Sequence, residues 1–413
     1  MLTLLPRRNA ILVFVAFAFA YFLSSLIRAI TATLSPTLTQ EFALNAQDLG
    51  LLAGGYFLGF AATQLPLGSW LDRHGPKKVI LYFLLVAVLG CMAFAMAESF
   101  TGLLLARLLT GVGVSACLMA PLTGYRRWFA ASSQMRANSW MLMTGSFGMV
   151  GSTLPVQWLM PLVGWRALFW ALAALVGLAM MLIAWQAPHW QTVAAPTSSP
   201  PVAKPSYAAV WHHQYFRKMA PMAFFIYGGL IAMQTLWVTP WMIRVAGFTP
   251  LHAATGLFWL NRALLGTFWA WGLVYPWLDR RRYSADRLIS HGIPLSFILL
   301  TLIIAAGAGI GVWAGVAWAL YCVSCTFISL AQPAVAMAFP PDLAGRALSA
   351  YNLLVFSGVF AVQWGIGLAI DGFRALGWTE MSAFQMAMAI YLLCTVASYV
   401  FFVTAKSHNQ QPR

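Results

Sequence analysis

Three arginines lie inside long apolar stretches of the sequence, where a charged side chain is costly. They are Arg28, Arg107 and Arg262. An arginine at the centre of a membrane helix costs about 2.5–3.5 kcal/mol on insertion scales, so it usually serves a function. No Asp, Glu or His lies deep in these stretches, so the cations lack an anion of their own. Because a guanidinium grips a carboxylate or phosphate with two parallel hydrogen bonds and stays protonated, the pattern predicts binding of an anion that enters from water.

Uncharged side chains in the same stretches could complete such a site. Tyr227, Gln234 and Asn352 are the candidates, although polar groups in membrane helices as often bond one helix to another. Trp237 and Trp241 could gate a cavity, but an aromatic belt at the membrane surface is the simpler interpretation. The sequence shows no nucleophile–base pair and no metal-ligand cluster, so it predicts neither an enzyme nor a bound metal or cofactor.

The composition indicates that these residues lie in membrane helices. The chain is 61% hydrophobic and 8% charged, against about 25% charged in soluble domains. Its net charge of +15 is explained by loops that face an anionic leaflet, and no nucleic-acid partner is expected. Apolar runs of about 20 residues predict an all-α polytopic membrane protein. Twelve transmembrane helices are expected, at roughly 10–33, 48–70, 79–97, 102–124, 138–160, 164–186, 219–243, 252–276, 288–308, 311–335, 347–370 and 381–404.

The spans divide into two similar halves. Residues 1–186 are predicted to form an N-terminal six-helix bundle and residues 219–413 a C-terminal one, with a Pro- and Ser-rich cytoplasmic linker over 187–218. The sequence Leu-Asp-Arg at 71–73 recurs at 278–280. Arg-Ala-Asn-Ser at the start of the fifth span matches Arg-Ala-Leu-Ser at the start of the eleventh, and Gly148 matches Gly358 at the same offset.

The distribution of positive charge predicts the orientation. Of the 24 Lys and Arg, eighteen fall in segments on the side of the N-terminus, three on the other side and three within spans. Cytoplasmic loops carry the excess of Lys and Arg, so both termini are expected in the cytoplasm of a multi-pass plasma (inner) membrane protein. The even number of spans independently requires the two termini to lie on one side.

The loop between the second and third spans reads Gly-Ser-Trp-Leu-Asp-Arg-His-Gly-Pro-Lys-Lys over 68–78. Its pattern of Gly68, Asp72, Arg73, Gly75 and Lys77 resembles the signature loop of the major facilitator superfamily of transporters. The resemblance implies two pseudo-symmetric six-helix halves with a substrate site between them near the midplane. It also implies that this loop governs helix movement as a conformational hinge, together with its partial repeat at Asp279 and Arg280.

A second resemblance concerns one branch of that superfamily. The stretch Arg-Ala-Ile-Thr-Ala-Thr-Leu-Ser-Pro over 28–36 is similar to the first-helix pattern of anion:cation symporters, in which the arginine contacts an organic anion. Arg-Leu-Leu-Thr-Gly-Val-Gly, beginning at Arg107, resembles the fourth-helix motif, whose arginine often braces neighbouring backbone. Proton-coupled members carry acids where this chain has Ile27 and Val114. Coupling is therefore open between anion exchange, a protonated substrate and Glu41 at the outer mouth.

These observations favour a secondary active transporter of a small organic anion, a carboxylate or similar, that works by alternating access. The alternative is proton-driven efflux of a hydrophobic, drug-like compound, which would need an acidic residue in the cavity. We expect a monomer whose partners are the lipid bilayer and a small anionic substrate.

Overall fold

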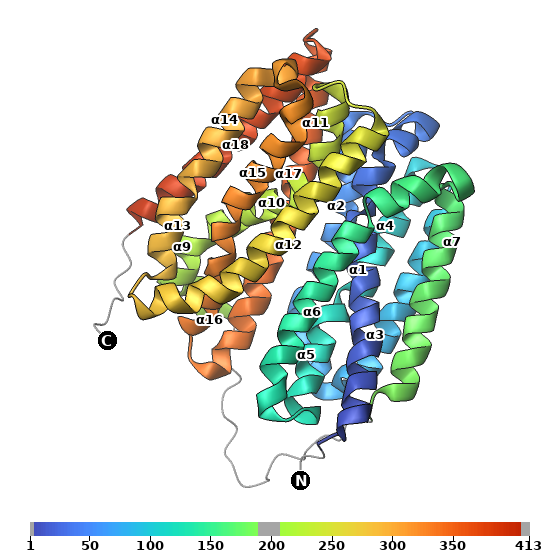
Figure 1. Cartoon of the computed structure of the whole chain (residues 1–413), viewed down its shortest axis with the longest axis vertical. Helices are drawn as coiled ribbons and strands as arrows, with labels where there is room; N and C mark the ends of the chain where they lie inside the picture. Colours follow the sequence, from blue (N-terminus) through green and yellow to red (C-terminus); the bar gives the residue numbers. More distant parts are fainter. Residues whose placement is uncertain (1–3, 189–206, 406–413) are drawn as a thin grey trace.

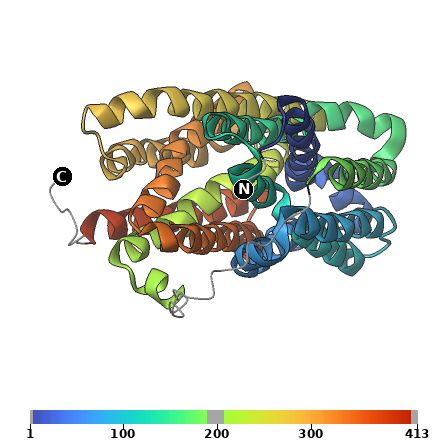
Figure 2. The ribbon, with the colours of Figure 1, turned by 90° about the horizontal axis from the view of Figure 1, so that it is seen from below.

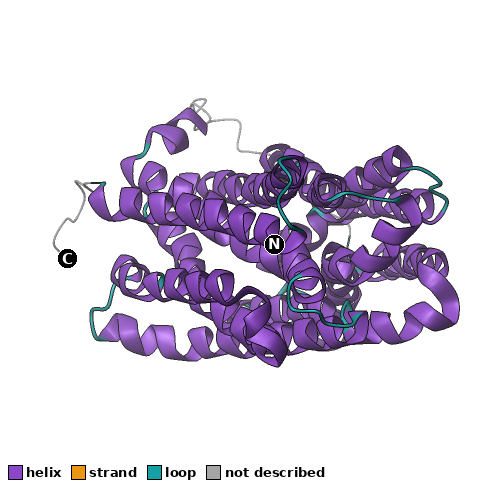
Figure 3. Ribbon diagram, turned by 90° about the horizontal axis from the view of Figure 1, so that it is seen from above, coloured by secondary structure: helices purple, strands orange, loops and turns teal. Residues whose placement is uncertain are grey.

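The computed structural model describes residues 4–188 and 207–405, and all regular structure in these ranges is helical (Figure 3). The N-terminal half contains α1 (Arg7–Phe42), α2 (Ala46–Ala62), α3 (Gln64–Ala95), α4 (Phe100–Val114), α5 (Ala116–Trp128), α6 (Ala131–Gly151) and α7 (Leu154–Gln186). The C-terminal half contains α8 (Tyr207–His212), α9 (Gln214–Met222), η1 (Ala223–Tyr227), α10 (Gly228–Ala232), η2 (Met233–Trp237), α11 (Val238–Arg244), α12 (Pro250–Arg280), α13 (Ala285–Gly292), α14 (Pro294–Ala306), η3 (Gly307–Trp313), α15 (Ala314–Cys325), η4 (Thr326–Leu330), α16 (Ala331–Met337), α17 (Pro341–Ala375) and α18 (Glu380–Thr404).

Two of the long helices contain a reversal of the chain at a glycine. Gly75 in α3 and Gly164 in α7 have φ values of 79° and 74°, which L side chains rarely adopt. The close contacts of α2 with α4 are parallel, whereas those of α3 after Gly75 with α4 are antiparallel. The chain therefore turns back at Gly75. In the same way, the part of α7 after Gly164 runs antiparallel to α3, with Trp165 near Phe94 and Ala187 bonded to Lys77.

These reversals explain the number of membrane crossings. By length and hydropathy alone, eight helical stretches among the described residues could cross a bilayer. Three of them, 64–95, 154–186 and 285–337, include a turn and belong to two crossings each, while α2, α6 and α12 supply the remaining segments. Counted by direction, the described helices make twelve crossings.

The two halves pair their helices in the same way, as their sequence repeat predicts. A Cβ on Gly148 of α6 would lie 2.3 Å from the Phe22 carbonyl oxygen of α1, and one on Gly358 of α17 would lie 2.1 Å from the Phe224 carbonyl oxygen of η1. The first span thus packs on the fifth as the seventh packs on the eleventh. In both pairs only glycine permits the approach.

The halves stand side by side and meet along α2 and α17 (Figures 1 and 2). These helices run antiparallel, and a Cβ on Gly50 would lie 2.4 Å from the Gln363 carbonyl oxygen. Near the outer ends, a Cβ on Gly367 would lie 2.3 Å from the Ala46 carbonyl oxygen. The backbones of α2 and α17 therefore touch in the outer part of the molecule, and the halves are closed against each other along these two helices.

Two boundaries differ from the sequence expectation. The first helix continues to Phe42 through Pro36, because proline ends a helix only where the lost hydrogen bond and the ring clash are not accommodated. Helical structure resumes with α8 and α9, so the seventh span begins at Gln214 and not at 219. Residues 189–206 of the expected linker lie outside the described residues.

Candidate functional site

Arg28 lies on α1 between the two halves and is half-buried. Its Cζ lies 5.5 Å from the ring centroid of Phe60 in one half and 5.9 Å from that of Phe356 in the other. The Tyr56 hydroxyl interacts with the guanidinium. The Arg28 Nε is buried, and no hydrogen-bond partner for it exists among the described residues. A buried donor without a partner is costly, so this guanidinium is suited to receive an acceptor from outside the protein.

Arg107 is fully buried on α4 and supports the α1 backbone beside Arg28. Its Nη1 donates a hydrogen bond of 3.0 Å to the Ile27 carbonyl oxygen, and its Cζ lies 5.0 Å from the Tyr56 ring centroid. Its Nε and Nη2 have no partner among the residues described. The observed contacts are those of a brace, and a direct substrate contact for Arg107 stays a prediction.

Tyr227, in the C-terminal half, also lies near Arg28. Its hydroxyl is close enough to Arg28 and Tyr21 to interact with them electrostatically. It ends η1, a π-helical turn, and such turns are often found at functional sites. The next residue, Gly228, packs against Gly358 so closely that a Cβ would lie 2.8 Å from the Gly358 carbonyl carbon. This glycine contact sets the position of Tyr227 next to α17.

The two predicted amides bond helix to helix. Gln234 Nε2 donates to Asn261 Oδ1 at 2.7 Å, which joins η2 to α12. Gln332 Nε2 donates to Asn352 Oδ1 at 3.2 Å, which joins α16 to α17. Both side chains thus already have an amide partner, and a role for Gln234 or Asn352 at the substrate stays a prediction.

Arg262 lies outside the cluster that Arg28 and Arg107 form around Tyr56. It is exposed on α12, and its Cζ lies 5.2 Å from the ring centroid of Trp259 and 5.8 Å from that of Phe258, both on its own helix. Arg28 and Arg107, by contrast, both lie close to Tyr56. The structure therefore brings two of the three predicted arginines together.

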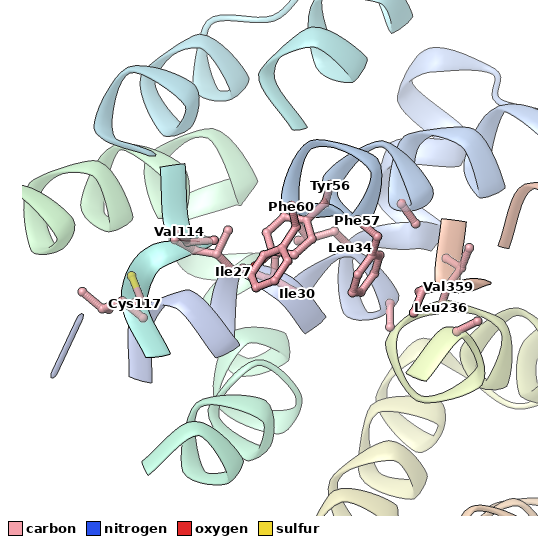
Figure 4. Packing of buried hydrophobic residues seen from close by; sticks show 14 of the residues in the cluster. Ile27, Ile30, Leu34, Tyr56, Phe57, Phe60, Val114, Cys117, Leu236 and Val359 are labelled. Atoms are coloured by element: carbon pink, nitrogen blue, oxygen red, sulfur yellow. The ribbon is translucent and has the colours of Figure 1, made fainter. Parts of the chain in front are cut away.

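The positions at which proton-coupled symporters carry acids are apolar and packed. Ile27 and Val114 lie close together in the buried cluster, with Cys117 beside them (Figure 4). Ser24 Oγ donates to the Val114 carbonyl oxygen at 3.5 Å, which holds α1 against α4. Arg28 and Arg107 consequently have no carboxylate at these two positions to neutralise them.

Trp237 and Trp241 are fully buried, so the interpretation as a surface aromatic belt is wrong for both. Trp237 Nε1 donates to the Gln363 carbonyl oxygen at 3.1 Å. The Trp241 ring packs edge-on against Trp318 and Phe384. The seventh span is buried more deeply than an aromatic belt would be because it lies at the junction of the two halves.

Two crossings precede the signature loop, so it lies on the side of the N-terminus, which the positive charges predict to be the inner side. Gly75 makes the turn with its positive φ, and Lys77 Nζ donates to the Ala187 carbonyl oxygen at 2.7 Å, at the end of α7. Asp72 and Arg73 are exposed. A Cβ on Gly68 would meet no atom within 4 Å, so close helix approach does not account for this glycine here.

The repeat of this loop at 278–280 forms the last turn of α12. Arg280 is exposed, and the side chain of Asp279 lies outside the described residues. The hinge role of both loops stays a prediction.

A cavity of about 770 Å³ opens between the halves on the outer side. Its lining includes Arg244, Arg374 and Glu380, and the Glu380 carboxylate lies 3.8 Å from Arg244 Nε and 3.4 Å from Arg374 Nη1. Ser35 also lines it, seven residues along α1 from Arg28. At 1.5 Å per residue, the Arg28 cluster lies roughly 10 Å further into the membrane.

One carboxylate in this cavity forms hydrogen bonds between the two halves. Asp371, on α17, accepts hydrogen bonds from the backbone N–H groups of Ala46 at 3.3 Å and Gln47 at 2.7 Å. These are the first two residues of α2, whose N–H groups have no partner within the helix. The carboxylate also lies at the positive end of the α2 dipole. Asp371 therefore joins the halves on their outer side, and no sequence signal pointed to it.

Glu41 is held as an anion on the outer surface. It accepts hydrogen bonds from Trp165 Nε1, at 2.7 Å, and from Arg166, with which it forms an ion pair. Partial burial alone would raise the pKa of the Glu41 carboxyl, but these two donors outweigh it and the pKa lies below its usual value. A carboxylate with a lowered pKa does not take up protons near neutral pH.

Comparison with known proteins decides the family. The sequence profile described as "Major Facilitator Superfamily" matches residues 17–363. The chain belongs to this superfamily. This is a family of membrane transporters and not of enzymes. A bacterial homologue of the human lysosomal transporter Spinster, solved in an inward-facing and unoccupied conformation, superimposes with a TM-score of 0.79 over 97% of both chains at 17% identity. That likeness shows the fold.

Curated relatives match only part of the superfamily member described here. A probable sulfoacetate transporter of Cupriavidus necator is 26% identical over 158 residues, 37% of this chain and 36% of that protein. The hexuronate transporter of Escherichia coli K12 is 27% identical over 163 residues, 37% of this chain and 38% of that protein. The matched region thus spans little more than a third of these relatives.

Proposed function

We propose that the chain is a secondary active transporter of a small organic anion, with Arg28 as the main contact for the negative charge. The observation that carries the proposal is the half-buried Arg28 guanidinium at the junction of the halves, whose Nε lacks a partner among the described residues. Rings from both halves flank it, as a site used in alternating access requires. Transport of sulfoacetate and hexuronates by distant relatives supports an organic anion.

The lack of nearby acids favours coupling to an anion gradient. Ile27 and Val114 cannot carry protons, and Glu41 is held as an anion. The same observations disfavour the alternative, proton-driven efflux of a hydrophobic compound, which would need a protonatable group at the site. The bacterial relatives further support placement in the inner membrane, with both termini in the cytoplasm.

The test measures the anion affinity of purified protein in which the guanidinium group of Arg28, with its two parallel N–H donors, is replaced. Arg28→Lys keeps the charge but loses the paired hydrogen bonds, and Arg28→Gln loses both. Truncating one partner of a buried charge pair costs about 2–5 kcal/mol, so the affinity of Arg28→Gln measured by calorimetry should fall at least about thirtyfold. Arg28→Gln should bind more weakly than Arg28→Lys.

A matched control must remove an arginine that touches nothing in the site. Arg166 is unsuitable because it pairs with Glu41. Arg217 is exposed at the inner end of α9, and Arg217→Gln should bind like the wild type. The same substitutions at Arg262 should resemble those at Arg28 if both arginines grip one anion. If Arg28→Gln binds and transports anions normally, the proposal fails and efflux of a hydrophobic compound becomes the better function.

A further inference from the structure

The surface beside Arg28 is aromatic, and both halves contribute to it. The ring centroids of Phe60 and Phe356 are 4.4 Å apart, with their planes tilted by 52°. Phe57 also stacks on Phe356, with ring centroids 6.2 Å apart and an interplanar angle of 14°. Phe356 is half-buried, as Arg28 is, so part of both side chains remains accessible. Phe60 is 6% exposed, so a molecule whose negative charge is held by Arg28 would meet chiefly the accessible part of the Phe356 ring.

Tyrosine hydroxyls provide the polar groups nearest to this surface. Tyr227 is half-buried and lies within electrostatic range of Arg28. Tyr351 is fully buried, lies within electrostatic range of Tyr227, and its hydroxyl has no hydrogen-bond partner among the described residues. These hydroxyls could serve one or two further oxygen atoms of a ligand.

The side-chain amides of Gln234, Asn352 and Gln363 are partly occupied by bonds to other side chains. The amides of Gln234 and Asn352 are bonded to Asn261 and Gln332 respectively. Gln363 Nε2 donates to Thr235 Oγ1 at 2.9 Å. Gln363 Oε1 and the Tyr351 hydroxyl have no partner among the described residues and could bind one hydroxyl group each. A polyhydroxylated sugar acid would bury its other hydroxyl groups against phenyl rings without replacing their hydrogen bonds to water, which is unfavourable.

We infer that the preferred substrate is a carboxylate with a planar aromatic body, of the benzoate type, whose carboxylate binds Arg28 and whose ring packs against Phe60 and Phe356. This inference rests on the proposed function, since it takes Arg28 as the anion contact. Offset or edge-to-face packing of a ligand ring on these phenyl groups adds stabilisation beyond the burial of area. It gives an aromatic ring an advantage over a saturated ring of the same size.

The experiment compares four anions on the purified full-length protein by calorimetry. Benzoate supplies an aromatic ring, cyclohexanecarboxylate a saturated ring of similar size, glucuronate a ring with hydroxyl groups, and acetate the carboxylate alone. Benzoate should bind most tightly, followed by cyclohexanecarboxylate and then glucuronate, and all binding should weaken in Arg28→Gln. If glucuronate binds more tightly than benzoate and still depends on Arg28, this inference is overturned while the proposed function stands. If no anion depends on Arg28, both fail.

A variant isolates the contribution of the ring. Phe356→Leu keeps an apolar side chain and should reduce benzoate affinity by roughly three- to tenfold, as expected for loss of one aromatic pair, with little change for acetate. Phe401→Leu is the matched control, because Phe401 is 48% exposed on α18 and should not affect any of the anions. Phe356→Tyr, which retains the ring, should keep the preference for benzoate over cyclohexanecarboxylate. Equal losses for benzoate and acetate in Phe356→Leu would contradict the inference.

Discussion

Asp371→Asn should open the outer side of the protein. In the structure, the Asp371 carboxylate accepts from the N–H groups of Ala46 and Gln47 at the start of α2, across the boundary between the halves. Asparagine has nearly the same shape and keeps one acceptor oxygen, but it loses the negative charge. Since the contact exists only when the outer side is closed, weakening it should shift the population towards the outward-open state.

The size of the shift follows from the type of contact. A negative charge at a helix N-terminus is worth about 0.3–1 kcal/mol, and up to about 2 kcal/mol when partly buried. Hydrogen bonds to a carboxylate are roughly twice as strong as those between neutral groups. Asp371 is half-buried and accepts two such bonds, so its replacement should cost about 1–2 kcal/mol. This changes the ratio of outer-closed to outer-open protein by roughly five- to thirtyfold.

The assay is a distance distribution between spin labels on the outer ends of the two halves. Glu98 and Leu376 are exposed in outer loops of opposite halves and can be replaced by labelled cysteines. Four of the five native cysteines are buried and the fifth, Cys394, is half-buried, so it is first changed to serine. Asp371→Asn should increase the population of long distances.

Asp48→Asn is the matched control. Asp48 lies in the same first turn of α2, but its capping interactions are with Asn45 in the same half. Removing its charge should weaken the helix end without changing the distances between the halves. An unchanged distribution in Asp371→Asn, or an equal change in Asp48→Asn, would refute the assignment of Asp371 as a contact that closes the outer side.

Three further predictions concern the loop, the pH dependence and the topology. Asp72→Asn should slow transport into proteoliposomes but leave anion affinity unchanged, and loss of affinity in a folded variant would contradict the hinge role. The pKa of Glu41 is lowered in the folded protein. The stability that its ion pair contributes is therefore fully present above the ordinary glutamate pKa of about 4.3, and it is lost only as the pH falls through the lower folded-state pKa. Transport by Glu41→Gln should therefore show the wild-type pH dependence between about pH 6 and 8, and uptake should follow an imposed anion gradient more than a proton gradient. A reporter inserted in 43–45 should be external and one fused after Arg413 cytoplasmic; an external C-terminal reporter would contradict the twelve crossings.

The fold was predictable because the bilayer imposes it. Span length, the excess of positive charge on one side and the internal repeat all follow from the cost of exposing backbone or charge to lipid. The prediction that Gly148 and Gly358 are equivalent is confirmed, since each packs against a carbonyl oxygen of the partner helix. A spacing of residues that is repeated in the two halves can be recognised without knowing the contact that requires it.

The details of the site were less predictable, because they depend on contacts between distant segments. Nothing in the sequence distinguishes Phe356 from the other 27 phenylalanines as the ring beside Arg28. The amide of Gln234 could have faced a substrate, and only the packing of η2 on α12 reveals its bond to Asn261. The π-helical turn that positions Tyr227 has no recognised sequence pattern.

The antiparallel pairing of α2 and α17 connects the outer contact with the signature loop. Gly50 packs on the backbone of Gln363, and Phe57 packs on the ring of Phe356. The residue numbers of facing residues on the two helices therefore have a nearly constant sum. Continued past α2 into α3, the same register brings Asp72 to the N-terminus of α17, which begins at Pro341. Asp72 is exposed here, and that end of the molecule lies furthest from the Asp371 contact.

Asp371, near the C-terminal end of α17, thus meets the N-terminus of α2 on the outer side, and the register places Asp72, in the part of α3 that continues α2, near the N-terminus of α17 on the inner side. Among the described residues only the Asp371 contact is present, and we expect the Asp72 contact to replace it when the inner side closes. Asp72→Asn should accordingly favour the inward-open state, the opposite of Asp371→Asn, and shorten the mean outer distance between the same spin labels. A shift of both variants in the same direction would show that the two carboxylates do not form a matched pair.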